Sequence, residues 1–184
     1  MTTEEYKDRF ETVVEEYIKR EGIKDLLEAI AKTDFYTAPA STKYHDSHEN
    51  GLVKHSLEVF DILYKDLNYQ DEISLESIAI VALFHDLCKT GFYEVSTRNT
   101  KDEKGKWIQV PYYTVNDLLP MGHGSKSVIL IQEFMKLSIE EIMAINWHMG
   151  LAIPKEDYRT LGKAFSEFPL ALYLHIADMK ATYL

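Results

Sequence analysis

A histidine and an aspartate follow directly after an apolar run in the middle of the chain. Residues 78–83 predict a buried helix, and the stretch Phe84-His85-Asp86-Leu87-Cys88-Lys89 comes next. An imidazole and a carboxylate at the end of such a helix lose their hydration, which costs free energy unless something binds both side chains. A divalent metal ion accepts neutral imidazole and carboxylate together. The sequence therefore predicts a metal site here.

The composition is typical of one soluble globular domain. The chain has 184 residues, of which 46% are apolar and 27% charged. A net charge of -10 disfavours long nucleic acid and anionic membrane as partners, although a small anion could bind where a metal reverses the local field. Cys88 is the only cysteine, so an intramolecular disulfide is impossible. The polar, acidic start of the sequence and the absence of a membrane-length apolar run predict a cytoplasmic protein; nothing indicates an oligomeric state.

Apolar residues at three- and four-residue spacing predict helices over most of the chain. We expect them at about residues 2–20, 23–32, 52–66, 74–86, 125–136, 138–147 and 168–184. Thr2 with Glu5, and Ser138 with Glu141, are capping boxes that mark two of the starts. The connections are predicted at residues 34–41, 44–51 and 151–158.

Residues 92–115 break the helical pattern. Tyr93, Val95 and Thr97 alternate with polar residues, and a second extended run begins at Trp107. The charged stretch at residues 102–105 lies between the runs as a turn, which predicts a β-hairpin that projects from the helical body or lies over it. The expected fold is a single all-α domain with a small inserted β-hairpin.

Six residues of ligating type recur at or near the ends of predicted helices or in a turn. They are His55, His85, Asp86, His123, His148 and Asp178. One histidine on an apolar face is more often a structural core residue, and one aspartate is more often bonded to a neighbour. Burying three or more such groups in one core without a common partner is costly, so the set favours a shared metal.

In order and context, the set resembles the H…HD…D signature of the HD superfamily of metal-dependent phosphohydrolases. Gly51-Leu52 precedes His55, Lys89 follows the His85-Asp86 pair, and Ala177-Asp178 lies in a late helix. The resemblance covers about residues 50–180, after N-terminal helices in residues 1–40. It implies an HD-type helical core in which His55, His85, Asp86 and Asp178 hold one metal.

Members of the superfamily with two metals show the longer pattern H…HD…H…H…D, and His123 and His148 match its two added histidines. Asp86 would then bridge the two ions. The resemblance implies one or two divalent ions, and a mixed imidazole and carboxylate shell suits Mn, Fe, Ni, Co, Zn or Mg.

The implied activity is hydrolysis of a phosphomonoester or phosphodiester in a small phosphorylated substrate of the nucleotide type. Asp86 would hold the nucleophile and Lys89 would stabilise phosphoryl charge, which makes these two the expected catalytic residues. Lys89 is also an expected substrate-binding residue. Lys126 is the second, because it lies near a predicted helix N-terminus, where anions bind. Lys89 could equally be an ordinary solvated side chain, and for Lys126 an ordinary surface lysine is the favoured alternative.

Two other functions fit the same pattern. Some two-metal relatives are di-iron oxygenases, and a degenerate member would be a non-catalytic nucleotide-binding module. The stretch after Lys89 has no Gly-Tyr-Pro motif, which disfavours the cyclic-di-GMP subgroup.

The remaining polar and aromatic residues have weaker assignments. His175 could orient Asp178 or touch substrate, and Cys88 is expected to be a small core residue. His45 and His48 are expected in a surface loop. Four aromatic residues could stack on a base if the hairpin covers the site, or pack the hairpin onto the helices: Tyr93, Trp107, Tyr112 and Tyr113.

Overall fold

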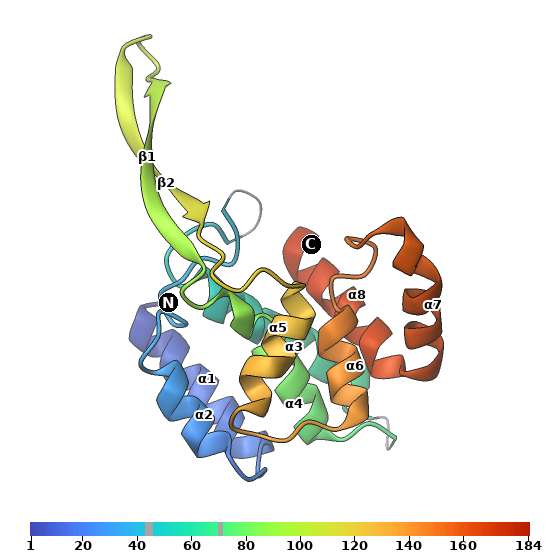
Figure 1. Cartoon of the computed structure of the whole chain (residues 1–184). Helices are drawn as coiled ribbons and strands as arrows, with labels where there is room; N and C mark the ends of the chain where they lie inside the picture. Colours follow the sequence, from blue (N-terminus) through green and yellow to red (C-terminus); the bar gives the residue numbers. More distant parts are fainter. Residues whose placement is uncertain (43–45, 70–71) are drawn as a thin grey trace.

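The computed structural model describes residues 1–42, 46–69 and 72–184. In this part of the chain eight α-helices form the body and two antiparallel strands form a hairpin that projects from it (Figure 1). The helices are α1 Thr3–Tyr17, α2 Ile23–Ile30, α3 Gly51–Leu67, α4 Leu75–Phe84, α5 His123–Gln132, α6 Ile139–Trp147, α7 Tyr158–Glu167 and α8 Pro169–Tyr183. The strands are β1 Tyr93–Lys101 and β2 Trp107–Val115. The mostly helical fold with one small hairpin confirms the coarse prediction.

Helix α4 lies in the middle of the body and packs against α1, α3, α6 and α8. Its residues from Ile78 to Phe84 are all completely buried. A helix that is covered on every side is apolar on every side, which explains why residues 78–83 form a continuous run without a polar face. The residues directly after this helix therefore enter the interior of the protein.

The helix starts follow their predicted caps. Thr2 and Ser138 each accept a hydrogen bond from the backbone N–H three residues on, and both capping boxes are complete. Ser74 Oγ accepts from Ser77 N–H at 3.0 Å and begins α4.

The sequence analysis missed α7 and misplaced the start of α5. We predicted a loop over residues 151–158 and the next helix only from residue 168, whereas α7 begins at Tyr158. It has no side-chain cap, and its buried residues are only Leu161 and Ala164, so its start carries no capping signal in the sequence. Helix α5 begins at His123, two residues before the predicted start, so His123 opens a helix rather than lying in a turn.

The hairpin projects from the body and does not lie over it (Figure 1). Val95 pairs with Tyr113 across the two strands, and the turn contains Gly105 at φ 77°. Val95 is 68% exposed and Trp107 is 66% exposed, so these side chains do not pack onto the helices. The predicted strands are confirmed, and the outer part of the hairpin is free to meet a partner.

A partly buried ion pair joins α4 and α6 to the connection between α1 and α2. The Glu141 carboxylate is fully buried and accepts hydrogen bonds from Arg20 Nη2 at 2.9 Å and Ser77 Oγ at 2.8 Å. Arg20 also donates to Glu76 at 3.0 Å. Burial raises the pKa of Glu141, but the hydrogen bonds from Arg20, the Ser138 backbone and Ser77 together outweigh it and hold the pKa below the usual 4.5.

Replacing Glu141 with glutamine should lower the free energy of unfolding at pH 7 by about 3 kcal/mol, because it removes one partner of a buried pair. The folded-state pKa of Glu141 lies below its unfolded value, so its stabilisation is present above about pH 4.5 and is lost as the pH falls through the folded pKa. The difference between Glu141→Gln and the wild type should therefore narrow at low pH. Urea denaturation over a pH series measures it.

The matched control is Glu167→Gln, because Glu167 forms an exposed pair with Lys163 at 3.7 Å. Exposed pairs contribute roughly 0–1 kcal/mol, so this change should be close to neutral at every pH. A loss in Glu141→Gln that is the same at pH 3 and pH 7 would contradict the assignment.

Candidate metal centre

Five of the six predicted ligands meet where α3, α6 and α8 pack around the end of α4. His55 comes from α3, His85 and Asp86 follow α4, His148 follows α6 and Asp178 belongs to α8. The three histidines are completely buried, and the Asp86 side chain is 3% exposed. Asp178 is the most open, with a side chain that is 16% exposed.

The ligating atoms of these residues have the spacing of a coordination shell. His55 Nε2 lies 3.0 Å from Asp178 Oδ1 and 4.0 Å from Asp86 Oδ2. His85 Nε2 is 3.4 Å from Asp86 Oδ2, and His148 Nε2 is 3.5 Å from Asp86 Oδ1. Ligands about 2.1 Å from a metal lie roughly 3.0 to 4.2 Å from one another. The observed distances fit that range, so the residues present fit a metal ion.

Two of the histidines are held in the tautomer that binds metal. The Nδ1 atom of His85 donates to the Ala82 carbonyl at 2.9 Å, and that of His148 donates to the Ile145 carbonyl at 2.7 Å. Each ring therefore presents the lone pair of Nε2 to the centre. Within the described part of the chain, these two Nε2 atoms and Asp86 Oδ1 have no hydrogen-bond partner. One cation would satisfy all three buried atoms.

The centre contains two ionised carboxylates and one buried ammonium group. Burial raises the pKa of Asp86, but Lys89 and His85 outweigh it and hold that pKa well below its usual range. Burial also raises the pKa of Asp178, but the hydrogen bond from His55 lowers it, and the resulting pKa is about 2. Lys89 Nζ lies 2.7 Å from Asp86 Oδ2. Burial lowers the pKa of Lys89, but the negative groups around it, the Asp86 carboxylate first among them, together raise it by more. The pKa therefore lies above its usual value, and the ammonium group stays charged.

His123 approaches Asp86 together with Cys88, apart from His148. Two groups share Asp86, and in each the ligating atoms lie within 4.8 Å of one another. One group is Asp86, Cys88 and His123, and the other is His85, Asp86 and His148. No group at that spacing in residues 1–42, 46–69 and 72–184 contains both His123 and His148. The predicted second ion held by both histidines thus stays a prediction. Asp86 belongs to both groups, which is the position a bridging carboxylate would need.

Cys88 is buried, as predicted, but it also has a contact that the sequence analysis missed. Its Sγ lies 3.3 Å from His123 Nδ1. Burial raises the pKa of the Cys88 thiol to about 12, so the sulfur is neutral at pH 7 and can accept from Nδ1–H. Burial also lowers the pKa of His123, which keeps the ring neutral. The signal in the sequence was the position of Cys88, two residues after Asp86.

Lys126 has its charge already paired. It is buried, its Nζ lies 2.5 Å from Asp117, and the same atom lies 5.1 Å from the centre of the Phe92 ring. A substrate phosphate would have to compete with Asp117 for this ammonium group. The substrate-binding role of Lys126 stays a prediction.

His175 supports His148 from behind. Its Nδ1 donates to the His148 carbonyl at 2.8 Å, and its ring stacks on Phe165 with the ring centroids 5.6 Å apart. Gly150 makes this approach possible, because a Cβ atom there would lie 2.2 Å from His175 Cε1. His48 lies in an exposed loop, as predicted, with Nε2 3.2 Å from Asp46. His45 lies outside the described residues.

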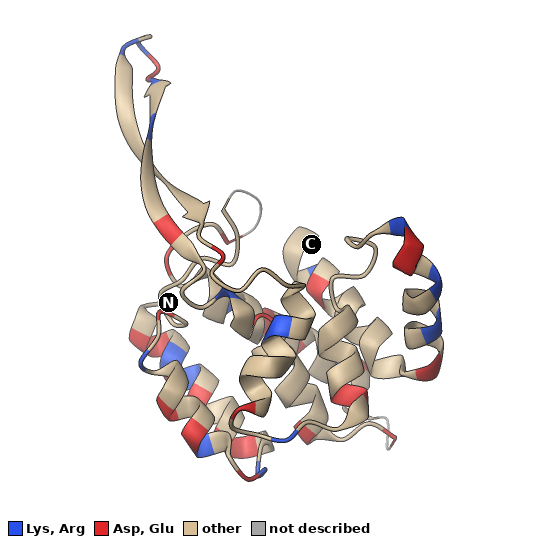
Figure 2. Cartoon of the chain, viewed as in Figure 1, with Lys and Arg blue, Asp and Glu red and all other residues tan. Residues whose placement is uncertain are grey.

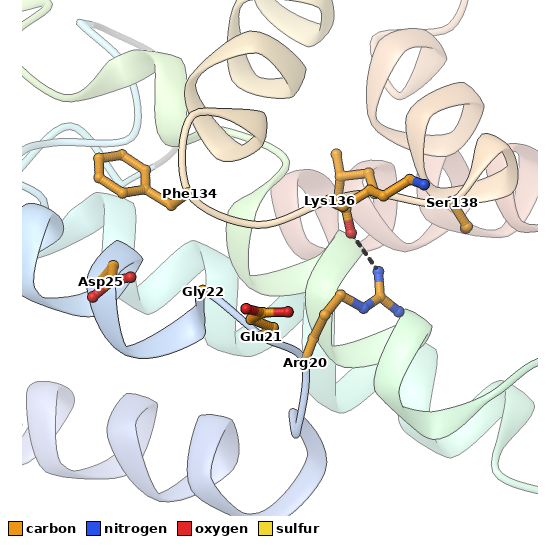
Figure 3. A pocket seen from close by; sticks show the side chains of 8 residues that line it. Arg20, Glu21, Gly22, Asp25, Phe134, Lys136 and Ser138 are labelled. Carbon is orange, nitrogen blue, oxygen red and sulfur yellow. Dashed lines mark hydrogen bonds between the residues drawn. The ribbon is translucent and has the colours of Figure 1, made fainter.

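A small cavity of about 200 Å³ opens onto the centre between α6 and α8. Its lining includes Asp86, Lys89, Met149, His175, Asp178 and Tyr183. A larger hollow of about 590 Å³ (Figure 3) and another of about 730 Å³ both include Gly22 in their lining and contain none of the ligating residues. Arg20, which lines both, donates to the Lys136 carbonyl and is paired with Glu141. The ligating residues thus favour the small cavity as the site of chemistry.

A scan against protein-family models and searches among curated proteins and solved structures found no match to this chain. The HD-type interpretation therefore depends on the residues and their geometry alone. Among the described helices, none combines the length and apolarity needed to cross a membrane.

Replacing His148 with alanine should weaken binding of a divalent ion by more than about tenfold, because it removes one of the convergent Nε2 atoms. Isothermal titration with Mn²⁺ and Zn²⁺, and the metal-induced rise in Tm, measure the change. His48→Ala is the control, because His48 is exposed and lies outside the centre. Equal affinity in wild type and His148→Ala would contradict a metal at this position.

Replacing Cys88 with alanine should lower the affinity only for the ion that His123 binds, by about tenfold. The His123 ring loses the acceptor that orients it. Cys88→Ser should restore part of the affinity, since a hydroxyl oxygen also accepts from Nδ1–H. The titration should show one weakened metal equivalent beside one unchanged equivalent. Two equivalents that weaken together would indicate general damage to the centre instead.

Proposed function

We propose that the chain is an HD-type metal-dependent phosphohydrolase that cleaves a phosphate ester of a nucleotide-type substrate. One observation carries the proposal: buried Nε2 and carboxylate atoms converge at the spacing of a metal shell, and the Lys89 ammonium group lies beside them. The ligands require a cation, and the ammonium group favours an anionic substrate. The order of the residues in the chain, which resembles the HD pattern, supports the same conclusion.

The residues divide the work between metal binding and charge stabilisation. His55, His85, Asp86 and Asp178 would hold the first ion, and Asp86 would extend to a second ion near His123 and His148. A bound divalent ion would supply a lowered water pKa and positive charge opposite the phosphoryl oxygens. Asp86 would orient the attacking water by accepting its hydrogen bond.

Lys89 is suited to stabilise the charge that develops on the phosphoryl group. Its Nζ is shared between Asp86 Oδ2 at 2.7 Å and the Ala40 carbonyl at 2.8 Å. These two acceptors fix the ammonium group at the edge of the cavity that Asp86 and Asp178 also line. A donor held in advance loses little free energy to reorganisation during the reaction.

Asp86→Asn should lower kcat/KM by at least about 10³-fold, and Lys89→Met by about 10²- to 10³-fold, because each removes a charge used in the transition state. The assay uses p-nitrophenyl phosphate and bis-p-nitrophenyl phosphate with each candidate metal in turn. The comparison also separates phosphomonoesterase from phosphodiesterase activity. Lys163→Met, on the exposed face of α7, is the control and should be fully active.

Full activity in Asp86→Asn would refute hydrolysis at this centre. Substrate-dependent O₂ uptake by iron-loaded protein without hydrolysis would assign the oxygenase alternative. Nucleotide binding without turnover, whichever metal is supplied, would assign the non-catalytic module.

A further inference from the structure

A separate hollow of about 310 Å³ lies at the root of the hairpin, where the strands meet the connection before α3. Four hydroxyl groups and one guanidinium group line it, from Thr42, Ser47, Tyr112, Tyr113 and Arg98. None of these residues belongs to the metal centre. We call this hollow the hairpin pocket.

The lining of the hairpin pocket suits a nucleotide. The guanidinium carbon of Arg98 lies 5.3 Å from the centre of the Tyr112 ring, so the cation rests on an aromatic face. Arginine binds phosphate through two parallel hydrogen bonds, and tyrosine rings stack on bases of any kind. The hydroxyl groups add donors and acceptors for a sugar or phosphate. A cation, a stacking face and several hydroxyls within one hollow match the three parts of a nucleotide.

The charge of the hairpin favours the same ligand. The hairpin, residues 93–115, contains four basic side chains against three acidic ones, whereas the whole chain has a net charge of -10 (Figure 2). The basic residues are Arg98, Lys101, Lys104 and Lys106. Lys101 Nζ lies 5.2 Å from the centre of the Trp107 ring, which repeats the pairing of cation and ring nearer the tip. Basic residues interleaved with aromatic ones are typical of surfaces that bind single strands.

The hairpin pocket is connected to the metal centre by direct contacts. The ring of Tyr113 lies 6.4 Å from the ring of Tyr93, centroid to centroid. Tyr93 Oη donates to the Ala40 carbonyl at 3.0 Å, and the same carbonyl accepts from Lys89 Nζ at 2.8 Å. The Ala40 carbonyl thus links the base of the hairpin at Tyr93 to Lys89 at the metal centre.

We propose that the hairpin pocket binds a nucleotide adjacent to the reacting phosphate, so that the substrate is a short single-stranded oligonucleotide. This inference rests on the proposed phosphohydrolase function and narrows its substrate. The cavity at the metal centre, about 200 Å³, is below the roughly 300–1,000 Å³ usual for ligand pockets, so the rest of a nucleotide substrate needs another surface. The acidic body disfavours a long strand, which agrees with the composition.

Binding of a fluorescein-labelled hexanucleotide tests the inference without turnover. Fluorescence anisotropy in EDTA gives Kd for wild type, Arg98→Ala and Tyr112→Ala, with RNA and DNA strands of one sequence as separate arms. Each substitution should raise Kd roughly tenfold or more, because each removes one half of the stacked pair. Arg98→Ala should also reduce the slope of log Kd against log salt concentration by about 0.7, the value of one phosphate contact.

The controls match the chemistry at sites away from the hairpin. Arg159→Ala and Tyr158→Ala lie at exposed positions of α7 and should leave Kd unchanged. Because Arg98 is exposed, the thermal unfolding of Arg98→Ala should match that of wild type, and circular dichroism checks this.

The outcomes separate this inference from the proposed function. Unchanged hexanucleotide affinity in both pocket variants, with hydrolysis of bis-p-nitrophenyl phosphate intact, overturns the inference and leaves the function standing. Binding that depends on Arg98 without hydrolysis of any substrate supports the pocket and overturns the function. A dimer that dissociates on Arg98→Ala with no change in strand affinity assigns the pocket to a second copy and overturns the inference. A tenfold difference between the two strand arms identifies RNA or DNA as the ligand.

Discussion

The buried carboxylate of Asp86 is the constraint on which the arrangement of the body depends. It follows α4, whose residues are covered on all sides, so water cannot solvate it. Its negative charge is balanced by Lys89 at 2.7 Å, and the Nε2 atoms of His85 and His148, at 3.4 and 3.5 Å, face it with their lone pairs. Because a buried charge is tolerated only with close partners, the packing of α6 against α8 and of α3 against α4 is tied to the completion of this one site.

The sequence predicted which residues meet around Asp86 because its signals were local and strong. A continuous apolar run predicted a helix covered on all sides, and the polar pair directly after it had to be buried. The convergence of His55, His148 and Asp178 on that pair followed from their places at helix ends and from the resemblance to the HD pattern. Order along the chain carries no distances, however. It could not show that His123 meets Asp86 beside Cys88 rather than beside His148.

The features that the sequence could not predict depend on contacts between segments without a strong pattern. The pair between Lys126 and Asp117 closes across a connection that has no periodicity, so the lysine looked available for substrate. Helix α7 lacks a side-chain cap and follows a short 3-10 turn, which hid its start. Alternation at Val95 and Tyr113 predicted strands, but it could not show whether the hairpin would cover the helices or project from them.

The cations of the body and those of the hairpin differ in the partners that hold them. Lys89 and Lys126 each lie against a carboxylate, so a phosphate that approaches either of them must compete with that carboxylate. Arg98 and Lys101 lie over aromatic rings, and a ring face stabilises a cation without neutralising its charge. In a chain with a net charge of -10, the exposed Arg98 and Lys101 are therefore more accessible to an anion than Lys89 and Lys126. The contacts from Tyr113 through Tyr93 to the Ala40 carbonyl link the base of the hairpin with Lys89 at the buried centre.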